Sequence, residues 1–276
     1  MHAASGQSRR RRTDARRAVL PRGTPGEGER QVAREDLVAP VAFGALGLIA
    51  WQGLATLLPD RVLPTPTAVA SRFVLELREG GLLGFAGHTL TEAVLGSLLG
   101  LAVAVPLGYL VARSRLVASA IGPYLAASQA IPAVALAPLL VVWFGYGLLP
   151  TALLCALLVF FPIFVNTTLG LSTLDPDVIG AAKVDGAGRW RLLVHIEGPL
   201  ALPALLAGIR NGFVLSVTGA VVGEFVMGGQ GLGLLLSVYR DRSDVEGMFA
   251  VLVALVALAI SVFYLIRSLE RRIQWL

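Results

Sequence analysis

Charged residues, cysteine and lysine are all scarce in this chain, and each shortage excludes a class of protein or site. Only 15% of the 276 residues are charged, against about a quarter in soluble domains. Hydrophobic residues make up 55% and the mean hydropathy is +0.74, which argues against a water-soluble globule and predicts a polytopic membrane protein. The single cysteine, Cys155, excludes an intrachain disulfide and a multi-cysteine metal site.

The motifs of nucleotide hydrolysis and of catalysis are missing as well. The only lysine, Lys183, follows Ala182 and belongs to no G-x4-G-K-[ST] sequence, so the chain has no P-loop of its own. His88 and His195 have no further ligand at metal-motif spacing, so solvated or hydrogen-bonded side chains are the simpler interpretation. The apolar runs show no nucleophile–base arrangement and no carboxylate pair. The sequence therefore indicates a protein that is not an enzyme and binds no cofactor or metal.

Positive charge is concentrated near the N-terminus. Residues 1–34 hold nine arginines and three acids, a net charge of +6. We interpret residues 1–37 as a disordered, basic cytoplasmic tail, because this stretch is polar and is interrupted by proline and glycine. A basic stretch before the first apolar run is typical of a cytoplasmic end. Residues 38–276 are expected to form the transmembrane domain.

Six apolar runs are long enough to cross a bilayer, which requires about 20 residues of helix. The expected spans are residues 38–58, 88–113, 116–144, 148–172, 198–223 and 247–268. Arginine and lysine gather after the second, fourth and sixth spans, which places both termini in the cytoplasm by the positive-inside rule. Pro132 and Pro138 interrupt the third span, and a pathway-lining break and a tolerated kink both explain them.

Two segments are not expected to cross the membrane. Thr65 can cap a helix that starts at Pro66, and apolar residues recur every four positions from Val69, which predicts an amphipathic helix on the outer surface. The stretch Gly228–Gly233 and the few apolar residues after it are too short to span. Their glycines favour a bend at the membrane interface.

Residues 175–197, between the fourth and fifth spans, predict a compact helix–turn–helix. Asp175 can cap a helix that begins at Pro176, and Gly186 is suited to end it. A second short helix, Arg189–Ile196, then leads into the next span. The small side chains of the whole loop allow a partner protein to approach closely, and its cations suit an acidic partner. The loop is therefore a candidate docking surface.

The spacing within this loop resembles the EAA motif of the inner-membrane permeases of ABC importers. In that family the loop is the coupling helix, which docks in a groove of the ATP-hydrolysing subunit. Gly180 and Gly198 stand where the motif usually has glutamate and leucine. By this resemblance, the residues that couple the chain to an ATPase are Gly180, Ala181, Ala182, Asp185, Gly186, Arg189, Ile196 and Pro199.

Further segments resemble, in the same order, the nitrate/sulfonate/taurine branch of these permeases, over residues 38–272. They are Leu63–Val69, His88, Ala137-Pro138, Trp143–Gly145, Phe160–Pro162, Asn166, Gly223–Phe225 and Gly231–Gly233. The resemblance implies an all-α, multi-pass protein of the bacterial plasma membrane, with six transmembrane helices and a type I ABC-importer permease (MetI-like) fold.

In function, the resemblance implies the permease subunit of an ATP-binding-cassette importer. An extracytoplasmic binding protein would deliver a small solute, for which an anion such as sulfonate, taurine or nitrate is expected. Related permeases serve a pyrimidine vitamin precursor or riboflavin, which are the alternatives. The implied partners are a second, identical permease copy and two copies of an ATP-binding subunit, which would hydrolyse the ATP. No contact with nucleic acid is expected.

Residues that interrupt or charge the spans are candidates for the substrate path: Pro132, Pro138, Trp143, Asn166, Arg210 and Glu224. Arg210 can orient an anion or tie its helix to a neighbour, and the second role is favoured. An interhelical hydrogen bond is favoured for Asn166, and a gate or packing role for Glu224. Glu92 is expected at the solvated outer interface. The alternative class is an ion-coupled secondary transporter, which would need intramembrane acids and often shows an internal repeat.

Overall fold

The computed structural model describes residues 27–59 and 61–273, and within these residues all regular structure is helical, as the composition predicts. The α-helices are α1 (Glu27–Leu57), α2 (Pro66–Arg78), α3 (Leu82–Arg113), α4 (Arg115–Gln129), α5 (Ala137–Phe144), α6 (Leu148–Ser172), α7 (Pro176–Val184), α8 (Arg189–Leu192), α9 (Gly198–Met227), α10 (Leu232–Asp241) and α11 (Val245–Ile273). A 3-10 turn, η1 (Ala133–Leu136), precedes α5, and a π-helical turn, η2 (Leu193–Glu197), joins α8 to α9. The chain divides into two compact units, residues 1–50 and 51–276.

Helix α1 supplies the described part of the first unit. Residues 1–26 of the predicted disordered tail lie outside the described residues, but residues 27–37, which were assigned to the same tail, are helical. That part of the prediction is wrong because the last glycine is Gly28, and glutamate, arginine, glutamine and alanine, all good helix formers, dominate the stretch after it. The apolar part of the helix is Val41–Leu57.

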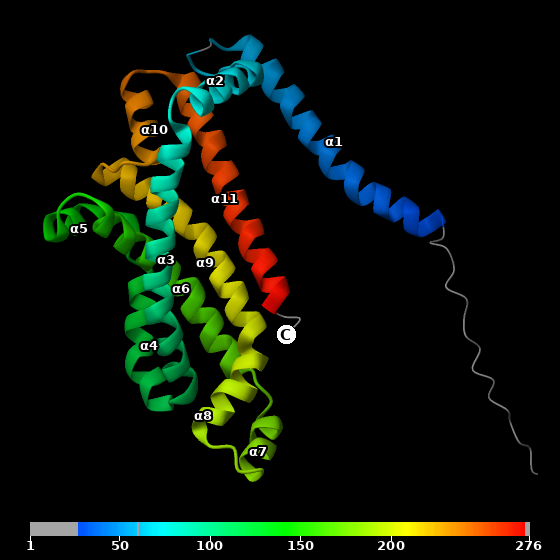
Figure 1. The fold of residues 1–276 in the computed structure, drawn as a ribbon, viewed down its shortest axis with the longest axis vertical. Coiled ribbons are helices and arrows are strands. Elements are labelled where there is room, and N and C mark those ends of the chain that lie inside the picture. The colour runs from blue at the N-terminus through cyan, green and yellow to red at the C-terminus, as the bar shows by residue number, and fades with distance from the viewer. Residues whose placement is uncertain (1–26, 60, 274–276) are drawn as a thin grey trace, which may run out of the picture. The chain divides into compact units, whose positions relative to one another are not determined.

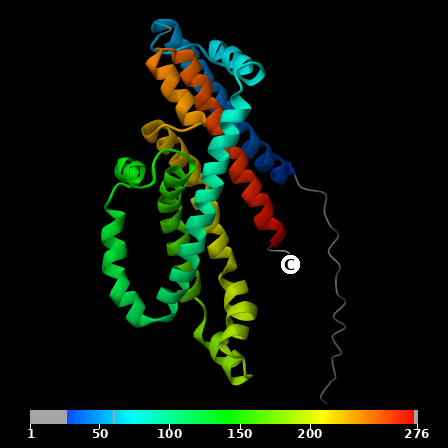
Figure 2. The ribbon, with the colours of Figure 1, turned by 60° about the vertical axis from the view of Figure 1, so that its left-hand side comes forward.

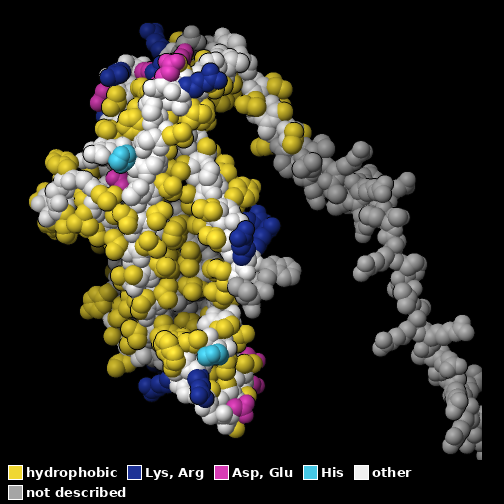
Figure 3. All heavy atoms as spheres, in the orientation of Figure 1, with side chains coloured by type: hydrophobic (Ala, Val, Ile, Leu, Met, Phe, Trp, Pro, Cys, Tyr) yellow, Lys and Arg dark blue, Asp and Glu magenta, His cyan; other side chains and the backbone are white. Residues whose placement is uncertain are grey.

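Four long helices of the second unit, α3, α6, α9 and α11, run side by side (Figure 1) and are each apolar and long enough to cross a membrane. Helices α2 and α10 lie at one end of this bundle, and α7 and α8 lie at the other (Figure 1). On the face that Figure 3 shows, hydrophobic side chains cover most of the bundle between the two ends, and most charged side chains lie at the ends, apart from one cluster of Lys and Arg side chains at the right-hand side. This is the distribution expected of a protein embedded in a bilayer.

The expected third span is not one straight helix. Helices α4 and α5 meet at a bend of 86° (Figure 2), so the segment of residues 116–144 is broken in the region where the sequence places two interrupting prolines. Pro132 explains the break, because proline lacks the N–H of the helical ladder and restricts the residue before it. With this pair counted as one span the described residues hold five, so the count of six and the positions of the termini stay predictions.

The two segments that were not expected to cross form short helices at one end of the bundle. Helix α2 starts at Pro66, and Thr65 Oγ1 accepts the Ala68 N–H at 3.2 Å, as the sequence predicts. The glycine-rich stretch of residues 228–231 turns the chain after α9. Helix α10 then packs on α9 and α11 through apolar residues that include Leu232 and Leu235.

The core of the second unit lies around α6, which contacts α3 on one side and α9 on another. Cys155, Val159 and Ile163 of α6 are fully buried. Small residues recur every three or four positions on the buried face of α3, at Ala93, Gly96, Gly100, Ala104 and Gly108. They let the two helix backbones approach closely, which is how helices associate where lipid removes the hydrophobic driving force.

Candidate functional site

The loop between α6 and α9 has the helix–turn–helix form that its sequence predicts. Helix α7 starts at Pro176, and Asp175 Oδ1 caps it by accepting the Asp177 N–H at 2.9 Å. The helix ends at Val184, and Gly186 just beyond it has a φ of +83°, which residues with a Cβ rarely adopt. Two crossed backbone hydrogen bonds then close a Schellman turn. The tip of the loop is therefore well ordered by its own backbone, so little conformational entropy is left to lose on docking.

Most of the predicted coupling residues lie on α7, on the turn after it and at the start of α8, whereas Ile196 lies in η2 and Pro199 in the first turn of α9. Those exposed are Gly180, Ala181, Asp185, Gly186, Arg189 and Pro199, and those half-buried are Ala182 and Ile196. Sequence reasoning missed Val184 and Trp190, whose side chains are 88% and 73% exposed. A tryptophan between two arginines on a hydrophilic loop was the available signal, because exposed aromatic side chains frequently anchor protein interfaces.

An ion pair ties the loop to the bundle at the end of α3. Arg113 Nη2 and Nε lie 2.7 and 3.2 Å from the two carboxylate oxygens of Glu197, which is 3% exposed. Bidentate pairs of this kind are strong and fix orientation. Glu197 ends the π-helical turn that leads into α9. The pair therefore links the loop to α3 at the point where α9 begins.

Arg210, a substrate-path candidate, is engaged within the fold. Its Nη1 lies 2.8 Å from Glu270 Oε2 on α11, and its guanidinium carbon lies 5.8 Å from the centre of the Phe263 ring. The arginine thus ties α9 to α11, which is the role that the sequence favoured. Asn166 donates to the Pro162 carbonyl of its own helix at 2.7 Å, where an interhelical bond was expected. This bond is local because a short polar side chain on a helix can reach the backbone carbonyl four residues earlier.

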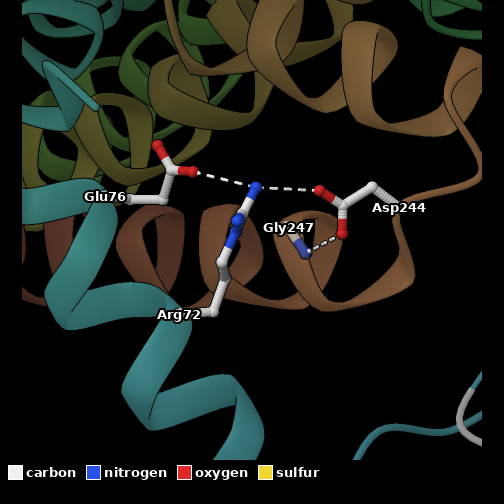
Figure 4. Close-up of polar contacts among 4 residues, drawn as sticks. All are labelled: Arg72, Glu76, Asp244 and Gly247. Atoms are coloured by element: carbon white, nitrogen blue, oxygen red, sulfur yellow. Dashed lines mark hydrogen bonds and ion pairs between the residues drawn. The ribbon is translucent and has the colours of Figure 1, made fainter. Parts of the chain in front are cut away.

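At the opposite end of the bundle, Arg72 of α2 joins two acids. Its Nη2 lies 3.2 Å from Glu76 Oε1 and 2.8 Å from Asp244 Oδ2, just before α11 (Figure 4). Asp244 Oδ1 also accepts the Gly247 N–H at 2.9 Å and so caps α11. The network holds the amphipathic helix α2 against the start of α11.

Tyr239 of α10 completes this cluster. The Arg72 guanidinium carbon lies 5.5 Å from the centre of its ring. Burial, reinforced by a hydrogen bond to Glu76, raises the pKa of the phenol from its usual 10 to about 12, so Tyr239 is neutral at pH 7. Because the folded-state pKa is the higher one, this contribution to stability is complete below pH 10 and is lost as the pH rises through about 12.

We expect Arg72→Ala to lower the stability of the purified protein by about 1–3 kcal/mol, because buried Glu76 and half-buried Asp244 would lose their charged donor. Arg78→Ala, an exposed arginine at the end of the same helix, is the matched control and should change stability little. Thermal unfolding in detergent measures both. Equal losses in the two variants would contradict a specific role for the Arg72 cluster.

Two buried carboxyl groups meet beneath α10, although no such pair was predicted in the apolar runs. Glu92 of α3 is 5% exposed and Glu224 of α9 is fully buried, so the expectation of a solvated Glu92 is wrong. Helix α3 begins at Leu82 rather than at residue 88, which places Glu92 well inside the helix. Glu92 Oε2 is buried and has no hydrogen-bond partner among the described residues.

The Glu224 carboxylate organises the chain around it. Its Oε1 accepts the Thr89 hydroxyl at 2.7 Å and its Oε2 accepts the Gly233 N–H. Thr89 Oγ1 in turn accepts the Leu232 N–H at 2.8 Å. Gly231 allows this approach, because a Cβ there would collide with both Glu224 and Thr89. Glu224 and Thr89 together cap the N-terminus of α10 from α9 and α3, which agrees with a packing role.

An apolar cleft lies on the other side of α6. One cavity of about 740 Å³ is formed by α3, the broken α4–α5 segment, α6 and α9, and an adjoining one of about 560 Å³ extends it toward α5. The two share Val103, Leu136, Leu157 and Phe160. The described residues that line them include no charged side chain, and the polar ones are Ser128 and Gln129.

Of the substrate-path candidates, Pro132 lines the larger cavity and Trp143 lines the smaller. Pro138 lies in the first turn of α5 and lines neither cavity. The other three candidates, Asn166, Arg210 and Glu224, also lie outside both cavities. Gln129 and Phe161, which line the larger cavity, were not predicted as path residues, because neither is charged and neither interrupts a helix. The described part of the chain gathers no group of three metal-ligating side chains.

Comparison with known proteins gives this geometry a context. Residues 104–275 match the protein family described as "Binding-protein-dependent transport system inner membrane component". The chain is similar to the riboflavin transport system permease protein RibX of Chloroflexus aurantiacus, with 43% identity over 226 residues, 81% of this chain and 84% of that protein. Both comparisons agree with a multi-pass protein of the bacterial plasma membrane.

Other relatives widen the range of solutes. The formylaminopyrimidine transport permease protein ThiX of Halalkalibacterium halodurans is 32% identical over 232 residues, 84% of this chain and 92% of that protein. The putative aliphatic sulfonates transport permease protein SsuC of Bacillus subtilis is 29% identical over 212 residues, 77% of each chain. In fold, the chain is similar to the inward-facing MetNI methionine ABC transporter, with a TM-score of 0.60 and 22% identity over 70% of this chain and 94% of that one. The MetI-like fold is thereby confirmed.

Proposed function

Since the chain belongs to the family of binding-protein-dependent transport system inner membrane components, we propose that it is the membrane-spanning subunit of an ATP-driven importer for a planar, uncharged heteroaromatic solute such as riboflavin. The lining of the cleft is the observation that supports this solute, because the described residues around both cavities are aliphatic, aromatic or neutral polar. An anion moved along this surface would lose its water without meeting a cation, which costs several kcal/mol at least.

The relatives support the same choice. RibX, which shares 43% of its aligned residues with this chain, is a riboflavin permease, whereas the sulfonate permease SsuC shares 29%. A small anion, the solute first expected from the sequence, needs a cation along the path. Arg210 was the candidate, but its guanidinium is paired with Glu270. The alternative, a sulfonate, taurine or nitrate importer, therefore lacks a partner for its solute among the described groups of the cleft.

We infer that the loop of residues 175–197 is the docking element for an ATP-binding subunit. Its exposed tip presents Val184 and Trp190, and the pair of Arg113 and Glu197 connects it to α3 and α9. Two identical permease copies with two ATPases would enclose the path. Closure of the ATPases on ATP would then move both loops together and shift the helices between inward- and outward-facing states. An extracytoplasmic binding protein would deliver solute at the end that carries α2 and α10.

Uptake into proteoliposomes tests this function. The permease is reconstituted with the ATPase and the binding protein that neighbouring genes encode, and labelled riboflavin is offered with ATP inside. We expect ATP-dependent accumulation that ionophores do not abolish and that excess taurine or nitrate does not inhibit. Uptake of taurine without riboflavin would overturn the proposed solute. Uptake driven by an ion gradient without ATP would overturn the importer assignment in favour of a secondary transporter.

A further inference from the structure

On the premise of the proposed function, we infer that the permease itself contains a solute-binding site in the 740 Å³ cavity, with Phe160 and Phe161 as two aromatic walls nearly at right angles and Gln129 as the hydrogen-bonding group. Its ligand is the flat heteroaromatic ring of a riboflavin-like solute. The cavity volume lies within the range of about 300–1,000 Å³ found for small-molecule sites. The adjoining 560 Å³ cavity leaves room for a substituent on that ring.

The aromatic surface is held rigidly from behind. Phe160 is stacked on Phe164, with ring centres 5.5 Å apart and planes at 10°, and Phe164 is 7% exposed. Phe161 meets Phe160 edge-on at 5.1 Å and 82°. Both Phe160 and Phe161 line the larger cavity. A ring that stacks there meets a surface that is already ordered, so little side-chain entropy is lost on binding.

The polar group at the cavity suits a heteroaromatic edge better than an anion. Gln129, at the end of α4, carries both a donor and an acceptor, as the edges of flavin and pyrimidine rings do. The Ser128 hydroxyl has no proton left to donate to a ligand, because it already donates to the Leu125 carbonyl at 2.8 Å. One neutral amide can orient a ring by its edge, but it cannot neutralise a sulfonate or nitrate.

The break in the helix favours a wet cavity over a lipid-filled groove. Ile131 and Pro132 lie between α4 and η1, outside any helix, and both line the cavity. Non-helical backbone at membrane depth is tolerated only where protein buries it or where it lines a water-filled cavity. Both residues are exposed within this chain. The broken segment is therefore placed where solute passes.

Transport by the complete complex tests the residues of the site. Phe161→Ala should lower the rate of riboflavin uptake about 3- to 10-fold at low solute concentration, Phe161→Trp should restore it, and Gln129→Leu should lower it similarly. Tyr124→Ala removes an exposed aromatic side chain of α4 that lines neither cavity, and it is the matched control. Because Phe161 is only half-buried, the variants should keep wild-type yield.

Protection from labelling locates the solute directly. Ile131→Cys in the reconstituted complex should react with a maleimide, riboflavin should slow that reaction at least about 5-fold, and taurine should not. Tyr124→Cys should react equally with and without riboflavin, and native Cys155 is fully buried. If lipid or the second permease copy filled the cavity, Ile131→Cys would not react even without solute, which would overturn the site. Wild-type riboflavin uptake without these effects would refute the site alone, whereas no uptake at all would refute the proposed function.

Discussion

Glu224→Ala is expected to abolish the accumulation of folded protein, whereas Glu92→Gln is expected to leave it nearly unchanged. Removing the Glu224 carboxylate leaves the Gly233 N–H without its acceptor, and leaves the Thr89 hydroxyl only the Phe85 carbonyl at 3.3 Å, in a place from which water is excluded. Each orphaned buried donor costs about 1–3 kcal/mol, and the cavity left behind adds to that loss. The sum is comparable with the whole stability of many proteins, about 5–15 kcal/mol.

The mild effect expected for Glu92→Gln follows from the absence of a hydrogen-bond partner for Glu92 Oε2. Glutamine has nearly the same shape as glutamate, so the packing is kept, and it carries no charge that burial would penalise. Yield of monodisperse protein on size exclusion and thermal unfolding in detergent measure both variants. Glu79→Ala, an exposed acid at the end of α2, is the control. A Glu224→Ala protein as stable as Glu79→Ala would refute the capping role, and a strongly destabilised Glu92→Gln would show that the Glu92 carboxylate makes a stabilising contact of its own.

Local features of the fold could be predicted because they depend on neighbouring residues. Thr65 and Asp175 cap their helices through backbone groups two or three positions away, and Gly186 ends α7 through its own φ. The positions of the long helices followed from apolar runs for the same reason. The fold class and the docking loop were therefore within reach of the sequence.

The tertiary contacts could not be predicted, because they join residues that are distant in the chain. Glu92 and Glu224 meet only since α3 and α9 pack side by side and α10 covers them. Arg210 pairs with Glu270 across the interface between α9 and α11, and no local sequence pattern specifies that contact. The cleft escaped prediction because its apolar lining is indistinguishable in sequence from a lipid-facing surface. In a membrane protein, hydrophobicity marks the spans but does not say which face is a path.

Trp190→Ala is expected to lower the affinity of the permease for the ATPase subunit of the proposed importer by at least about 30-fold. This corresponds to a loss of about 2 kcal/mol of binding free energy, as expected for an aromatic anchor. The side chain is 73% exposed at the tip of the docking loop, next to the cations Arg189 and Arg191. Co-purification of the ATPase in mild detergent, followed by titration, measures the loss. His195→Ala, an exposed residue on the same loop, is the matched control.

Steric variants at the turn should have an even larger effect. Gly186→Trp demands an unfavourable φ from a bulky residue, and Ala182→Glu places a charge on the small surface of α7, so neither should retain the ATPase. The double variant Arg113→Ala with Glu197→Gln separates docking from coupling, because it removes the link to α3 without leaving a buried charge unpaired. This double variant should bind the ATPase normally and hydrolyse ATP, but transport should fall at least about 10-fold. Retention of the ATPase by both steric variants would refute docking at this loop, and full transport by the double variant would refute the pair of Arg113 and Glu197 as the link that carries the movement.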